Sequence, residues 1–132
     1  MKKFGNAIML VLLIAAVFIY YTEMIPIKVD AVTLAASYSK NKTAADSKFL
    51  DKELEVTGTV KAFYKLVDIR NVLELNTGES KISLFCFFVN EIDENKAAMF
   101  REGDTVKLIG KCIGLDKYKF VDGVKIEVKK IE

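Results

Sequence analysis

The chain of 132 residues contains no histidine and only two cysteines. Histidine is the base in Ser-His-Asp and Cys-His catalytic arrangements, so both arrangements are excluded. Two thiolates need two further strong ligands to close a zinc site, and no histidine is present to supply them. The seven glycines fall where turns and strand bends are expected, and their spacing matches no phosphate-binding loop. We therefore expect a protein without catalytic residues, metal or cofactor.

The chain also lacks the basic excess that is typical of nucleic-acid-binding proteins. It has 20 lysine and arginine residues against 18 aspartate and glutamate residues. Lys2 and Lys3 precede the N-terminal hydrophobic run, so the part of the chain beyond Tyr21 is neutral. This balance disfavours nucleic acid as the ligand, although a local basic patch stays open.

An uncharged hydrophobic run extends from Ala7 to Tyr21. It ends in two tyrosines, whose amphipathic rings favour the membrane–water boundary. A membrane-spanning helix needs about 20 apolar residues, a length that is reached if the whole of 4–25 contributes. We predict an uncleaved single-pass anchor over residues 4–25, with Lys2 and Lys3 holding the N-terminus in the cytoplasm. The following domain would then lie in the periplasm or outside the cell.

Two other interpretations of this segment stay open. A cleavable signal peptide shares the charged start and the apolar core, but it also needs small residues at the cleavage site. The triplet Val29-Asp30-Ala31 is tolerable for cleavage but lies about ten residues past the run, and a lipoprotein signal would need a cysteine that is absent there. Cleavage would give a secreted domain. The other interpretation, a buried helix of a soluble protein, is disfavoured because no polar stripe interrupts the run.

Beyond Pro26 the sequence predicts a short linker and then a helix over residues 31–41 that Asp30 caps. A short second helix is expected before residue 53. From there the apolar residues recur at every second position, which is typical of strands with one buried face. The predicted strands cover residues 52–63, 71–80, 81–90, 104–113 and 124–131. A helix between an Asn90 cap and a Gly103 stop separates the third strand from the fourth.

The alternation also predicts which residues face inward. The expected core is Leu54, Val56, Val60, Leu73, Leu75, Ile82, Leu84, Cys86, Val106, Leu108, Cys112, Val124, Ile126 and Val128. Ala62 is expected inward as well, and Phe85 and Phe87 are expected to face outward beneath the helix at 31–41. Gly114 is expected to end the fourth strand, and the Asp122-Gly123 pair is expected to form the last hairpin turn.

Five strands with a helix between the third and the fourth is the order of an OB-fold, a small Greek-key barrel. The predicted fold class is therefore all-β with accessory helices, preceded by an N-terminal membrane helix. We divide the chain into a transmembrane or signal segment (1–25), a linker with a helix (26–52) and the barrel (53–132).

Short motifs occur in a fixed order along the chain. They are Tyr38 with Asn41, Ala45-Asp46, Val56-Thr57-Gly58 with Val60, Cys86, and finally Gly103, Val106, Gly110, Cys112 and Gly114. In this order they resemble the exported bacterial OB-fold domains described as tRNA-anti-codon-like (tRNA_anti-like), over roughly residues 32–131. The resemblance implies a small barrel, commonly membrane-anchored or carried by a lipoprotein. It does not imply tRNA binding, because the family name reflects similarity of fold.

Cys86 and Cys112 fall on inward positions of the third and fourth strands. In the OB order the fifth strand lies between those two, which separates the cysteines by about 9.5 Å. A disulfide requires Cα atoms within about 6.8 Å. We favour two buried free thiols, and a Cys86–Cys112 disulfide, which would suit an exported domain, stays open as the alternative.

OB-folds bind ligands on the face of their second and third strands and on the adjoining loops. The basic and aromatic residues expected there are Tyr64, Lys65, Arg70, Lys117, Tyr118 and Lys119. We predict a non-catalytic binding module at the bacterial envelope with a protein, peptide or glycan partner. Single-stranded nucleic acid, held by stacking and basic residues, is the alternative. An ordinary surface role for these residues also stays open.

Overall fold

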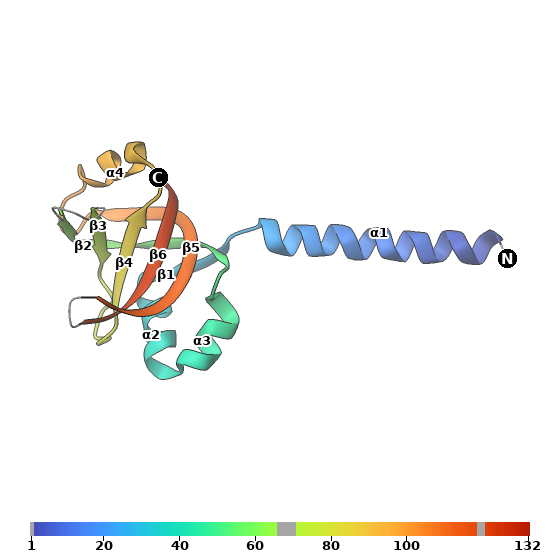
Figure 1. Ribbon diagram of the computed structural model, residues 1–132, viewed down its shortest axis with the longest axis horizontal. Helices are drawn as coiled ribbons and strands as arrows, with labels where there is room; N and C mark the ends of the chain where they lie inside the picture. Colours follow the sequence, from blue (N-terminus) through green and yellow to red (C-terminus); the bar gives the residue numbers. More distant parts are fainter. Residues whose placement is uncertain (1, 66–70, 119–120) are drawn as a thin grey trace.

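The computed structural model describes residues 2–65, 71–118 and 121–132, and it shows a long N-terminal helix attached to a small barrel (Figure 1). The elements in chain order are α1 (Lys2–Met24), β1 (Ile27–Asp30), α2 (Ala31–Lys40), α3 (Lys42–Phe49), β2 (Glu53–Tyr64), β3 (Val72–Leu75), β4 (Ser83–Phe88), α4 (Glu91–Ala97), β5 (Thr105–Tyr118) and β6 (Val121–Ile131). The predicted order of three strands, a helix and two strands is confirmed from β2 onward.

Helix α1 extends away from the barrel (Figure 1). Its large apolar side chains between Ile8 and Ile19 are all more than half exposed. Within the described residues, no helix combines the length and the apolar character needed to cross a membrane. The expected N-terminal helix is therefore present, and its membrane role stays a prediction.

Five strands close into a barrel in the order β2–β3–β4–β6–β5, with β5 pairing back onto β2. Strand β2 makes the closure because it is long enough to serve two neighbours. Its residues 53–59 pair with β5, and its residues 60–64 pair with β3. The pairing of β4 with β6 is parallel, and the chain crosses between them through α4 and β5. This is the closed barrel with accessory helices that the sequence predicts.

The segment Ile27–Asp30 is a strand and not the predicted linker. It pairs in parallel with β2, from Ile27 opposite Leu54 to Asp30 opposite Thr57. It occupies the half of that β2 edge that β3 does not reach. Four residues are too few for an alternating pattern to stand out from a linker, which is why the sequence did not indicate this strand.

Helices α2 and α3 lie at one end of the barrel and α4 lies at the other (Figure 1). The predicted cap of α2 is confirmed, because Asp30 Oδ1 accepts a hydrogen bond from Thr33 N at 2.7 Å. Asn41 caps α3 in the same way and accepts a hydrogen bond from Ala44 N at 3.1 Å. The second cap lets the chain pass from one helix to the next with Asn41 alone between them.

The predicted core is confirmed with one exception, since Ile82 is only partly buried while every other residue of that set is buried. The first two helices after α1 add further members to this core: Ala31, Leu34, Tyr38, Ala45 and Phe49. Helix α2 therefore fills the end of the barrel and does not lie over its outer face.

This placement of α2 overturns one expectation. Phe85 and Phe87 do not pack beneath the helix at 31–41 but form a separate cluster with Val72 on the outer face of the barrel. The sequence indicated correctly that the two rings face away from the main core. It did not indicate that they are nearly buried there.

A register shift in β2 changes the inward residue near its end. The shift lies between Val60 and Ala62, and beyond it Phe63 is opposite Leu73 of β3. Phe63 therefore packs against the core, whereas Ala62 does not, contrary to the expected alternation. A bulge of this kind adds one residue to one strand and reverses which side chains face inward.

The hairpin of β5 and β6 also differs from the prediction. Gly114 does not end the strand, because β5 continues to Tyr118 past a register shift between Cys112 and Gly114. The Asp122-Gly123 pair is not the turn, since both residues are paired within β6. The connection between the two strands falls at residues 119–120, outside the described residues.

Candidate binding surfaces

The structure places only part of the predicted ligand face. Tyr64 ends β2 with 41% of its surface exposed, and the exposed Lys65 follows it. The remaining four residues lie outside the described residues, either entirely or with their side chains: Arg70, Lys119, Lys117 and Tyr118. The ends of β2 and β5 are therefore placed, and whether the six side chains form one surface stays a prediction.

Strand register sets two rows of residues on the outer face of β2, β3, β4 and β6. One row contains Tyr64, Val72, Phe87 and Glu127, and the other contains Ala62, Glu74, Phe85 and Lys125. Sequence analysis did not include Glu74 and Lys125 among the candidate residues. The signal for Glu74 was its position between two inward leucines on a strand of the ligand face.

Glu74 is the charged residue that joins its neighbours on this outer face, and it is only 5% exposed. Its Oε1 accepts a hydrogen bond from the Tyr64 hydroxyl at 2.7 Å, and its Oε2 lies 3.4 Å from Lys61 Nζ. The hydrogen bond to Glu74, together with burial, raises the pKa of Tyr64 to about 12. The carboxylate therefore fixes the Tyr64 ring and keeps its hydroxyl protonated to a higher pH than that of an ordinary tyrosine.

The two phenylalanines of this face are nearly buried. Phe85 and Phe87 are 6% and 9% exposed. A Cβ at Gly123 would lie 2.6 Å from the Phe85 ring, so this ring rests against the bare backbone of β6. Lys125 Nζ lies 4.6 Å from the centre of the Phe87 ring, which is a cation–π distance. Neither ring is an open platform of the kind on which bases stack.

Cys86 and Cys112 are free and fully buried. Each is in register with Ile126 of β6, so Ile126 lies between them. Two strand spacings, about 9.5 Å, therefore separate the two cysteines, and the alternative disulfide is not formed in this structure. Burial raises the pKa of both thiols, so neither is a thiolate at neutral pH.

Several motif residues meet at one junction between the helices and the barrel. The Tyr38 hydroxyl of α2 lies 3.6 Å from Cys112 Sγ of β5. Helix α3 approaches the same strand at Gly114, whose φ is +94° and where a Cβ would lie 2.9 Å from Leu50 Cδ1 and 3.6 Å from Asp46 Oδ1. These residues hold the α2–α3 pair against β5, so packing explains their presence without a catalytic role.

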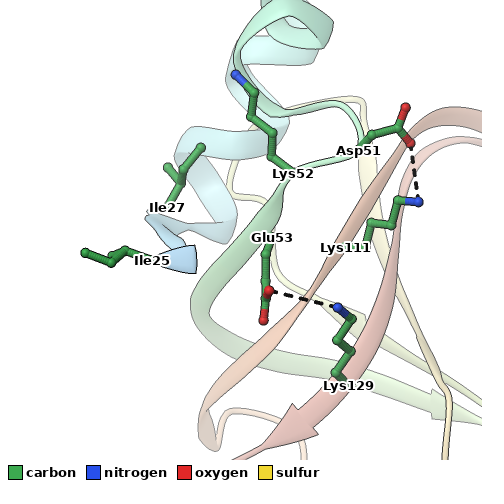
Figure 2. A pocket seen from close by; sticks show the side chains of 7 residues that line it. All are labelled: Ile25, Ile27, Asp51, Lys52, Glu53, Lys111 and Lys129. Atoms are coloured by element: carbon green, nitrogen blue, oxygen red, sulfur yellow. Dashed lines mark ion pairs between the residues drawn. The ribbon is translucent and has the colours of Figure 1, made fainter. Parts of the chain in front are cut away.

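A pocket opens where α1 joins the barrel (Figure 2). Its volume is about 570 Å³, and it is lined by Ile25, Ile27, Asp51, Lys52, Glu53, Lys111 and Lys129. Two long ion pairs lie in it, from Lys111 Nζ to Asp51 Oδ1 at 3.8 Å and from Lys129 Nζ to Glu53 Oε2 at 3.9 Å. Its residues come from four separate segments, so no local motif indicated it.

The two candidate surfaces offer different chemical groups to a ligand. In the part of the chain that the structure describes, no three cysteine, aspartate or glutamate side chains are grouped so as to hold a metal ion. The outer face offers a tyrosine, a carboxylate and lysines beside an apolar cluster, and the pocket offers three ammonium groups beside two isoleucines.

Comparison with solved structures identifies the same fold. A putative nucleic acid-binding lipoprotein from Klebsiella pneumoniae aligns with a TM-score of 0.57 and 12% identity, over 80% of this chain and 92% of that one. A putative aspartyl-tRNA synthetase from Leishmania major aligns with a TM-score of 0.54 and 14% identity over 83% of this chain, which spans 21% of the synthetase. An OBody bound to hen egg-white lysozyme aligns with a TM-score of 0.53 and 16% identity, over 64% of this chain and 82% of that one. At such identities the likeness concerns the fold alone.

Comparison of the sequence gives a more specific result. No curated protein matches the chain. The model of the tRNA_anti-like family matches residues 21–122, which include β1, α2, α3 and the barrel through the whole of β5 to the first two residues of β6. The match agrees with the motifs at the α2–α3 junction and with the closed five-stranded barrel, and the chain therefore belongs to the tRNA_anti-like family.

Proposed function

We propose that the chain is a non-catalytic OB-fold binding module, held at the bacterial envelope by α1, whose outer barrel face binds a segment of another protein. The observation that carries the ligand part is the pair of exposed side chains Tyr64 and Lys61, which the nearly buried carboxylate of Glu74 holds side by side on the outer face. An exposed tyrosine ring beside an ammonium group suits the mixed polar and apolar surface of a polypeptide.

The attachment part of the proposal is supported by the surface of α1. Large apolar side chains are exposed around the helix between Ile8 and Ile19, and water does not stabilise such a surface. A helix that is apolar all round is typical of a lipid or protein interior. Lys2 and Lys3 precede it, which favours a cytoplasmic N-terminus and an exported barrel.

The charge and the packing of the outer face support a protein ligand over single-stranded nucleic acid. Phe85 and Phe87 are nearly buried, and Lys125 already lies over the Phe87 ring. A phosphate backbone would also approach the carboxylate of Glu74, which is unfavourable unless basic residues compensate.

A site-specific crosslinking experiment tests the ligand face. A photoreactive phenylalanine analogue replaces Tyr64 in the full chain, and the same analogue replaces the exposed Glu102 as a matched control. We expect a discrete protein adduct from position 64 in native membranes and none from position 102. Equal labelling from both positions, or labelling from neither, would contradict the proposed face.

Attachment is tested separately by extracting membranes with alkaline carbonate and by adding protease to intact spheroplasts. We expect the full chain to stay with the membrane and the barrel to be cleaved from outside. Release by carbonate, or a barrel that the protease does not reach, would contradict this part of the proposal.

Single-stranded nucleic acid is the second candidate ligand, favoured by the exposed Tyr64 and Lys65 at the end of β2. Fluorescence anisotropy of labelled DNA and RNA oligonucleotides tests it. Binding that weakens steeply with salt and is lost in Lys65→Gln would establish this alternative in place of the protein ligand.

A further inference from the structure

We propose that the lysine-lined pocket at the C-terminal end of α1 binds the phosphodiester headgroup of an anionic phospholipid (Figure 2). The inference rests on the proposed attachment of α1 to a membrane. It adds a second binding site to the module, separate from the outer face of β3 and β4.

The first argument is the length of the connection between α1 and the barrel. Helix α1 ends at Met24 and β1 begins at Ile27, so only two residues lie between them. The Cα atoms of Met24 and Ile27 are therefore at most about 11 Å apart. From Ile27 onward the chain is fixed to β2 by strand pairing, so the distance between the end of α1 and the barrel stays short.

The position of the pocket follows from this connection. Ile25 and Ile27 both line it, and Ile25 is 54% exposed. When α1 lies in a bilayer, residues that immediately follow it are at the level of the headgroups, and so is a pocket that they line. An apolar residue beside ammonium groups suits this boundary between acyl chains and phosphates.

The second argument is the charge of the pocket. Three lysines face two carboxylates, which leaves one positive charge in excess: Lys52, Lys111 and Lys129 against Asp51 and Glu53. Figure 2 shows Lys111 directed toward Asp51 and Lys129 toward Glu53, with Lys52 apart from both pairs. Among the described residues, Lys52 takes part in no ion pair, and its Nζ donates to the carbonyl of Ser47 at 3.2 Å.

Both ion pairs leave the ammonium groups of their lysines able to bind a ligand. Their N–O distances of 3.8 and 3.9 Å exceed hydrogen-bond length, and the side chains of Lys111 and Lys129 are 46% and 56% exposed. Exposed ion pairs of this kind contribute little to stability, so a phosphodiester can attract both ammonium groups away from their carboxylates. The pocket volume of about 570 Å³ lies within the range of small-molecule sites.

The test uses the full chain in nanodiscs of phosphatidylcholine, with and without added phosphatidylglycerol. The rate of acetylation of each lysine is followed by mass spectrometry, and the exposed Lys81 of the distant β3–β4 turn serves as the internal reference. We expect Lys52, Lys111 and Lys129 to react at least about threefold more slowly when phosphatidylglycerol is present, because each lysine near an anionic surface gains about fivefold in binding. Lys81 should not change. Equal rates in the two lipids would overturn the proposal.

A matched pair of variants gives a second measurement. Lys52→Gln/Lys111→Gln/Lys129→Gln removes the pocket charges, and Lys40→Gln/Lys81→Gln/Lys96→Gln removes the same charge from exposed positions outside both candidate sites. Phosphatidylglycerol that stays bound after detergent extraction is measured by native mass spectrometry. We expect the pocket variant to lose it and the control variant to keep it. Equal retention would overturn the proposal even if both variants are less stable.

Two further outcomes separate the sources of failure. A chain that does not stay with nanodiscs of either composition would overturn the attachment itself. A chain that stays, but whose three lysines are protected equally by inorganic phosphate in phosphatidylcholine nanodiscs, would identify a site for free anions and overturn the lipid proposal alone.

Discussion

The hydroxyl of Tyr38 lies 3.6 Å from the Sγ of Cys112, and this contact joins α2 to β5 inside the core. Burial is the main cause that raises the pKa of each group, so both stay protonated at neutral pH. The two residues are 74 positions apart in the chain. Their contact therefore depends on a completed barrel and not on local structure.

Tyr38→Phe should lower the free energy of unfolding by about 1 kcal/mol, because a buried polar contact is lost while the ring is kept. The same substitution in a Cys112→Ala background should cost less, since the partner is already gone. Urea unfolding of the four proteins of this double-mutant cycle measures the coupling. Strictly additive effects would show that the 3.6 Å contact contributes nothing.

Gly110→Val should destabilise the barrel by about 2–4 kcal/mol, because the added atoms collide with backbone that must then move. A Cβ at this position would lie 2.5 Å from the carbonyl oxygen of Glu127 and 2.9 Å from Val128 Cα. Gly58→Val should also destabilise it, since a Cβ there would lie 2.9 Å from Ala31 Cβ. Lys111→Val, on the exposed side of β5, is the control and should change stability little. Thermal unfolding temperatures equal to that of the wild type in both glycine variants would contradict the close approach of these strands.

Cys86 and Cys112 should react with iodoacetamide on the order of 100-fold more slowly in the native protein than in denaturant, because both thiols are buried and protonated. A cysteine introduced at the exposed position of Glu102 should react rapidly in the same native sample. Intact mass after alkylation gives the number of reacted thiols. A native mass that is two hydrogens lower, with no thiol reacting after unfolding, would instead establish a disulfide.

Tyr64 should make stability depend on alkaline pH. Its pKa is raised from 10.0 to about 12 in the folded protein, so its hydrogen bond to Glu74 contributes fully below pH 10 and is lost as the pH rises toward 12. The difference in urea midpoint between the wild type and Tyr64→Phe should therefore shrink over this interval. Comparing the two proteins at each pH cancels the titration of the lysines. A difference that stays constant from pH 9 to pH 12 would argue against the bond between Tyr64 and Glu74.

The strand pattern predicted the barrel well because one face of each strand is buried. The prediction of inward-facing residues was wrong where two residues of one strand oppose a single residue of its neighbour. The register shift between Val60 and Ala62 turns Phe63 inward, and nothing in the alternation reveals such an insertion. Gly123 shows a second limit of sequence-based prediction. A glycine suits both a tight turn and a strand position where an aromatic ring packs directly against the backbone. Only the position of Phe85 decides between them.

The candidate sites were less predictable than the fold. Tyr64 was found from its expected place in the loop after the first strand, but its partner Glu74 became a site residue only when the register was known. The pocket of Lys52, Lys111 and Lys129 had no sequence signal, because the closure of β5 and β6 onto β2 brings these lysines together. Long-range pairing of this kind is set by the whole barrel.

The position of Ile126 between Cys86 and Cys112 has a consequence for the order of folding. Strand β6 follows the other barrel strands in the chain, and until it inserts between β4 and β5 no strand separates the two thiols. An exported chain would meet oxidising conditions at that stage. We expect a chain truncated after Tyr118 to form the Cys86–Cys112 bridge on oxidation, as a loss of two hydrogens in its mass would show, and the full chain to resist it. The final strand would then act as a spacer that protects the thiols from mispairing as well as closing the barrel.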